Sequence, residues 1–112
     1  MHKFTPETAL KVVAEYYNIP EDWVTKQCRK PKFTMPRHMG MSICYENMLP
    51  PGEIAKVFKT ERTMPGYAWE KLESKCRTDE GVRKDRDKIR ELLMDGRKKV
   101  IQANPSSVLS DT

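Results

Sequence analysis

Residues 50–76 read PPGEIAKVFKTERTMPGYAWEKLESKC, and this stretch predicts two helices joined by a tight turn. The proline pair at its start ends any preceding helix, and a short helix over residues 53–58 follows it. Residues 59–62 carry no apolar side chain, which indicates a turn of four residues. Thr63 fits the cap of a second helix, whose apolar residues recur at helical spacing. Two helices joined in this way are the geometry of a helix-turn-helix.

Upstream of this stretch, similar signals predict three more helices. The first covers residues 5–18 and opens on a Thr-Pro pair, and the second is a short helix over residues 20–26. A loop over residues 27–34 then leads to a third helix that starts at Thr34 and runs up to the proline pair. Gly40 would let a neighbouring helix approach the third one closely. We expect these apolar residues to face the core: Leu10, Val13, Ala14, Tyr17, Trp23, Val24, Met39, Ile43, Cys44 and Met48.

Downstream, Asp79 opens a last helix with an apolar stripe (Val82, Ile89, Leu92 and Leu93) and a face of alternating charges. Residues 96–112 are basic and then polar, which predicts a turn and a flexible C-terminal tail. A chain of 112 residues suits one domain, here residues 1–95. The predicted fold is therefore all-α, with about six helices that include a helix-turn-helix.

Positive charge is concentrated in one segment. Lys and Arg number 21 against 16 Asp and Glu, which gives a net charge of +5. The segment from residue 26 to residue 38 holds five of these cations and no acid, namely Lys26, Arg29, Lys30, Lys32 and Arg37. Such a segment can neutralise several phosphates and release their counterions, which gives affinity for nucleic acid that falls with salt. The alternative interpretation is a solvated surface loop.

Arg37 and His38 fall in the first turn of the predicted third helix. Backbone N–H groups point outward there and the helix dipole is positive, so side chains and helix end could bind a phosphate together. A simple exposed first turn is the other interpretation.

The helix-turn-helix supplies the candidates for reading bases, because a recognition helix contacts base edges with its N-terminal residues. Arg62 could contact a guanine, and Thr63 or Met64 could contact a phosphate or a thymine methyl group. The other interpretation is that Thr63 is only a helix cap and Met64 only a core residue. Tyr67, Trp69 and Lys71 lie further along and could contact DNA or pack. The DNA-binding candidates in this region are Lys59, Thr60, Arg62, Thr63, Met64 and Tyr67.

Several other classes are disfavoured. Cys28, Cys44 and Cys76 are far apart and form no Cys-x-x-Cys pair, which argues against a disulfide framework or a zinc site. With two histidines besides, we expect no metal and no cofactor. We find no phosphate-binding glycine loop and no nucleophile with a matching histidine and acid, so we expect no catalytic residues and no enzyme. Apolar stretches are too short for a membrane span, and we expect a cytoplasmic, nucleoid-associated protein.

Three stretches in register resemble the C-terminal DNA-binding domain of the bacterial chromosomal replication initiator DnaA. Residues 13–19 (VAEYYNI) look like the opening helix of that domain. Residues 35–41 (MPRHMGM) are similar to its Arg-Pro-Arg-Gln-x-Ala-Met stretch, and residues 49–58 (LPPGEIAKVF) to its Ser-Leu-Pro-Glu-Ile-Gly-x-x-Phe. The resemblance covers about residues 5–95.

This resemblance implies the fold of DnaA domain IV, which is Trp-repressor-like, and binding to double-stranded DNA. The family places its recognition helix in the major groove, and its basic loop in the adjacent minor groove and on phosphates. Arg37 matches a DNA-contacting arginine of the family, and His38 replaces a contacting glutamine. The family's minor-groove arginine falls on Pro31, so Lys30 or Lys32 would have to take its place.

The recognition signature differs from that of the family. Where the family reads Gly-Gly-Arg-Asp-His-Thr-Thr-Val, residues 59–66 read KTERTMPG, so Arg62, Thr63 and Met64 replace the base-reading Asp-His-Thr. The resemblance therefore implies phosphate contacts like those of the family but a different sequence readout. The family's ATPase module has no counterpart in this sequence, and we expect DNA binding without ATPase activity.

Two hypotheses of function follow. The first is a double-stranded DNA-binding protein, sequence-specific, that acts in replication initiation, in its regulation or in transcription. The second is a protein-interaction module that keeps the fold but has lost specific readout, with Met64, Tyr67 and Trp69 as an apolar patch for a replication or transcription partner.

Overall fold

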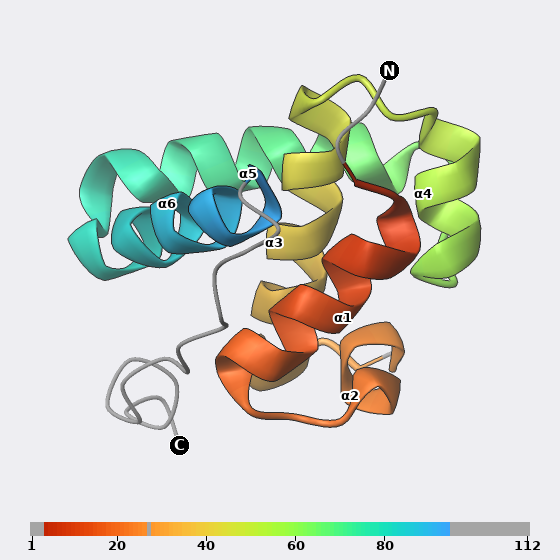
Figure 1. Ribbon diagram of the computed structural model, residues 1–112. Helices are drawn as coiled ribbons and strands as arrows, with labels where there is room; N and C mark the ends of the chain where they lie inside the picture. Colours follow the sequence, from red (N-terminus) through yellow and green to blue (C-terminus); the bar gives the residue numbers. More distant parts are fainter. Residues whose placement is uncertain (1–3, 27, 95–112) are drawn as a thin grey trace.

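The computed structural model of the protein describes residues 4–26 and 28–94, in which six helices and no strand are found. The prediction of an all-α fold with about six helices is confirmed. Figure 1 shows α3 in the middle of the molecule, with α1 and α5 on its two sides. The helices are α1 (Pro6–Tyr17), α2 (Glu21–Thr25), α3 (Pro31–Glu46), α4 (Pro51–Val57), α5 (Met64–Thr78) and α6 (Glu80–Met94).

The first two helices begin and end close to the predicted residues. The Thr5 side chain accepts a hydrogen bond from the backbone N–H of Thr8 at 3.2 Å, and Pro6 occupies the first helical position. Asn18 ends α1 in the left-handed conformation, with φ of 56°. The backbone is extended at Pro20, just before α2, and again at Lys26, just after it.

The third helix begins earlier than predicted. The backbone is extended at Lys30 and helical from Pro31, so the predicted loop is wrong over residues 31–34. Both Pro31 and Pro36 fit the first turn of a helix, and the sequence does not choose between them. Burial of the Phe33 side chain favours the earlier start. Pro36 then lies inside the helix, where its missing N–H costs one backbone hydrogen bond.

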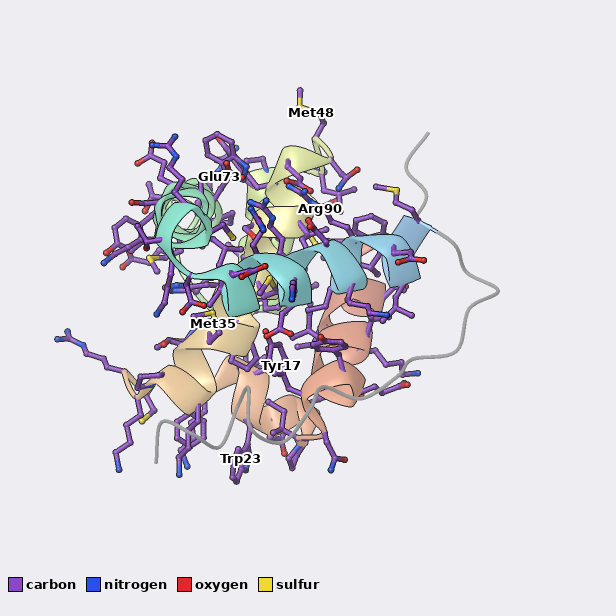
Figure 2. All side chains as sticks on the ribbon, turned by 90° about the vertical axis from the view of Figure 1, so that its left-hand side faces the viewer. Tyr17, Trp23, Met35, Met48, Glu73 and Arg90 are labelled. Atoms are coloured by element: carbon purple, nitrogen blue, oxygen red, sulfur yellow. The ribbon has the colours of Figure 1, made fainter. Side chains whose placement is uncertain are left out.

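Two predicted core residues are exposed instead: Trp23 of α2, which is 37 % exposed, and Met48 after the end of α3. The helix ends at Glu46, and Met48 takes a left-handed backbone conformation with φ of 66°. Met48 is 80 % exposed, whereas the next residue, Leu49, is buried. Figure 2 shows the Met48 side chain pointing away from the rest of the molecule. The predicted apolar stripe of the third helix is one turn too long, because the helix ends at Glu46 and residues 47–48 form a turn.

Helices α4 and α5 are the predicted pair, joined by residues 58–63. Helix α4 starts at Pro51, two residues before the prediction. Lys59 has a left-handed backbone with φ of 55°, which turns the chain toward α5. Thr63 stands directly before α5 as predicted, but its own backbone is helical and its side chain makes no capping hydrogen bond.

Helix α6 starts after Asp79, whose carboxylate accepts a hydrogen bond from the N–H of Val82 at 3.1 Å. Ion pairs join α6 to two other helices, Arg86 to Glu73 of α5 at 2.8 Å and Arg90 to Glu46 of α3 at 2.6 Å. In Figure 2, where α6 runs across the front of the molecule, Glu73 and Arg90 are labelled above this helix. The predicted tail, residues 96–112, lies outside the described residues.

The core lies where α1, α4, α5 and α6 meet α3. At Gly40 a Cβ atom would come within 2.7 Å of the Phe58 ring, so the residue must be glycine for this close approach, as predicted. The largest fully buried side chains are Phe58, Met39, Met41, Ile43, Ile54 and Ile89.

Candidate nucleic-acid interface

The start of α3 and the middle of α5 lie side by side. The rings of His38 and Tyr67 meet edge to face, with 6.4 Å between their centroids. Figure 2 shows Met35, on the first turns of α3, on the same side of the molecule as α5. The first half of α3, into which the cationic segment leads, therefore lies beside α5. A cleft between the two helices, here called the α3–α5 cleft, is lined by Thr34, Met35, His38, Lys71, Leu72 and Lys75.

Four of the predicted phosphate-binding residues are exposed, and we call them the basic segment: Lys26, Arg29, Lys30 and Lys32. Two of these ammonium groups lie against aromatic rings. The Nζ atom of Lys26 is 5.5 Å from the centroid of Phe33, and that of Lys32 is 5.4 Å from Phe33 and 5.6 Å from Trp23. Cation–π attraction holds the two charges at the surface without neutralising them.

Arg37 does not lie where the sequence predicts. It is the seventh residue of α3 rather than part of its first turn, and its side chain is only 8 % exposed. Its guanidinium donates hydrogen bonds to the carbonyl oxygens of Lys26 and Cys28, the latter at 3.3 Å. Burial lowers the pKa of Arg37. The guanidinium thus fixes the backbone that carries the basic segment, and it is turned away from any phosphate at the surface.

His38 also lies beyond the first turn of α3, half-buried in the α3–α5 cleft. Burial, together with the smaller effects of the charges of Arg37, Lys71 and Lys75, lowers its pKa to about 4. The imidazole is therefore neutral near pH 7. It can accept or donate one hydrogen bond into the cleft but carries no charge there.

One exposed row of α5 follows Thr63 at four-residue spacing, with Tyr67, Lys71 and Lys75, and the exposed Glu70 and Ser74 lie next to this row. The ammonium group of Lys71 lies 5.7 Å from the centroid of the Tyr67 ring. From the sequence, Lys71 could either contact DNA or pack, and Lys75 is not among the predicted site residues. The four-residue spacing from the predicted site residue Tyr67 would have identified both.

The remaining candidates surround the start of α5. Lys59, Arg62 and Thr63 are exposed, whereas Thr60 and Met64 are half-buried. The side chain of Met64 packs against the core. A shallow hollow here is lined by Tyr45, Pro51, Arg62, Thr63, Gly66, Tyr67 and Glu70. Because this hollow contains a carboxylate, positive charge is weaker here than in the α3–α5 cleft.

The apolar patch of the second hypothesis is not continuous. Of its three members only Tyr67, 47 % exposed, is at the surface. Met64 and Trp69 are half-buried, and the Trp69 ring lies 6.1 Å from that of Tyr45.

Three further observations concern other classes of site. Cys28, Cys44 and Cys76 are free thiols. Among residues 4–26 and 28–94, no cluster of three or more His, Cys, Asp or Glu could hold a metal ion. No helix in the same ranges is long and apolar enough to cross a membrane.

Comparison of the chain with models of known protein families, and with curated proteins, finds no match. The resemblance to the DnaA domain therefore rests on the sequence motifs alone.

Proposed function

We propose that this chain binds double-stranded DNA and acts, without ATPase activity, in replication initiation, in its regulation or in transcription. In this proposal the exposed face of α5 enters the major groove, and the basic segment binds the adjacent phosphates or minor groove. The role in replication follows from the resemblance to the DnaA domain.

The observation that carries the proposal is the position of two groups of exposed cations, here called the cationic surface. The basic segment leads into the first turn of α3, and Lys71 and Lys75 of α5 line a cleft with Thr34 and Met35 of that same end of α3. None of these six cations forms an ion pair within the described part of the chain. On α6, by contrast, Arg83, Arg86 and Arg90 all pair with carboxylates. Uncompensated cations attract a polyanion.

Charge reversal within and outside this surface tests the proposal. Lys30→Glu and Lys71→Glu should each weaken binding to a labelled duplex by about tenfold or more, because each removes a phosphate contact and adds repulsion. Lys11→Glu, on the exposed face of α1, is the matched control and should change binding little. Fluorescence anisotropy measures all three. Equal losses in all three variants, or none in the first two, would contradict the proposal.

A selection of bound sequences from a random duplex pool addresses specificity. If Arg62 contacts a base, the selected sites should share a fixed base pair that Arg62→Ala relaxes by about 1–3 kcal/mol. Lys30→Ala should instead weaken all sequences alike.

A further inference from the structure

The α3–α5 cleft brings hydrogen-bond donors from two helices to one place. Helix α3 contributes the Thr34 hydroxyl and the His38 imidazole, and α5 contributes the ammonium groups of Lys71 and Lys75. The cleft has a volume of about 180 Å³, and no carboxylate lines it. A small anion fits such a set of groups better than any cation or apolar ligand.

Apolar contacts hold these groups in position. Met35 and Leu72 line the cleft, and the Tyr67 ring contacts both the His38 ring and the ammonium group of Lys71. Leu72 is buried, so the α5 side of the cleft is anchored in the core. The His38 ring and the Lys71 ammonium group are therefore positioned before any ligand arrives, which reduces the entropy cost of binding.

We propose that the α3–α5 cleft binds a phosphate group of the DNA backbone through Lys71, Lys75 and Thr34, and that His38 takes up a proton when the phosphate binds. This inference rests on the proposed function and assigns it one specific phosphate contact. With α5 in the major groove and the basic segment at the neighbouring groove, the strand between the two grooves would cross this cleft.

The proton uptake follows from the charges that face His38. Arg37 on its own helix and Lys71 and Lys75 on α5 all repel a proton from the imidazole, and its pKa is about 4 in the free protein. A phosphate between the two lysines offsets their charge, so the pKa of His38 rises in the complex. Binding is then strongest below the pKa of the free protein, weakens as pH increases from that pKa to the raised pKa of the complex, and is constant above the raised pKa.

Nuclear magnetic resonance of the imidazole tests the inference directly. The chain has two histidines, so His2→Gln leaves His38 as the only imidazole signal. Its pH titration is recorded for the protein alone, with a duplex and with inorganic phosphate. We expect a midpoint near 4 for the protein alone. The duplex should raise this midpoint by about 1 pH unit or more, and inorganic phosphate should do so only at much higher concentration.

Each outcome separates this inference from the proposed function. A duplex that binds without moving the His38 midpoint overturns the inference and leaves DNA binding intact. If inorganic phosphate raises the His38 midpoint but the protein binds no duplex, the cleft is an anion site whose phosphate does not come from DNA. If neither ligand moves the midpoint, the cleft is not a phosphate site.

Two variants give an independent measurement. Between the free midpoint near pH 4 and the raised midpoint of the complex, duplex affinity should fall by up to about tenfold per pH unit in the unmodified chain, and His38→Gln should reduce this dependence. Lys75→Met should lower the duplex affinity and prevent inorganic phosphate from raising the His38 midpoint, whereas Lys11→Met should do neither. An unchanged pH dependence in His38→Gln would contradict the proton uptake. Circular dichroism confirms that each variant is folded.

Discussion

At the scale of single residues, Arg37 shows what sequence could and could not predict. Its place in an acid-free basic stretch indicated a phosphate contact. If α3 started at Thr34, the side chain would lie in an exposed first turn, but the start at Pro31 turns it toward the carbonyl oxygens of Lys26 and Cys28. A shift of three residues in a helix start therefore changed its role, and no pattern in the sequence fixes that start.

Arg37→Met should release the backbone of the basic segment. We expect the free energy of unfolding to fall by about 1.5–3 kcal/mol, because hydrogen bonds from a charged donor are lost in a buried site. Trypsin should also cut faster after Lys26 and Arg29, since their backbone is no longer held. Chemical denaturation and timed proteolysis measure the two effects. Arg77→Met, at an exposed position on α5, is the control.

If Arg37 bound DNA directly, Arg37→Met would reduce affinity and leave the proteolysis rate unchanged. That result would contradict the positioning role described above.

At the scale of helices, the sequence predicted the number of elements correctly and most of their boundaries closely. The Thr-Pro pair located the start of α1, and Asp79 located the start of α6, because these residues act locally, through capping. The starts of α3 and α4 were placed too late. At each of them two positions could open the helix, and burial in the folded chain, which depends on tertiary packing, decides between them.

Gly40→Ala should destabilise the contact between α3 and Phe58. Alanine normally favours a helix over glycine by about 1 kcal/mol. Here its Cβ would lie 2.7 and 2.9 Å from two Phe58 ring carbons, and the ring is fully buried. Overpacking should prevail and lower the free energy of unfolding by about 1–3 kcal/mol in thermal or chemical denaturation.

The matched control is Gly66→Ala, whose Cβ would meet Tyr45 at an ordinary 3.4 Å. This variant should be neutral or more stable. Equal effects at both glycines would show that the close approach at Gly40 does not limit the packing.

Arg90→Met tests the attachment of α6 to α3. The guanidinium donates two hydrogen bonds of 2.6 Å to the two carboxylate oxygens of Glu46, in a partly buried pair. Its loss should lower the free energy of unfolding by about 1–2 kcal/mol. Arg83→Met removes an exposed pair with Glu80 and should change stability by about 0.5 kcal/mol or less. Denaturation curves that rank the two variants in the opposite order would refute this assignment.

At the scale of the whole molecule, the cationic surface depends on tertiary structure that sequence patterns do not encode. The basic segment could be predicted from composition alone. Its position relative to α5 depends on how α3 packs, and among sequence arguments only the resemblance to the DnaA domain implied it. Lys75 was missed because its charge is unremarkable in the sequence and becomes informative only next to His38 and Lys71.

The salt dependence of duplex binding tests the central claim most directly, because it counts the phosphates that the surface neutralises. With about five phosphates neutralised, raising salt from about 50 to 200 mM should weaken binding by two or more orders of magnitude. Lys30→Ala and Lys71→Ala should each reduce the slope of log affinity against log salt by about 1. A slope near zero in the unmodified chain, or no binding to any duplex at low salt, would contradict the account.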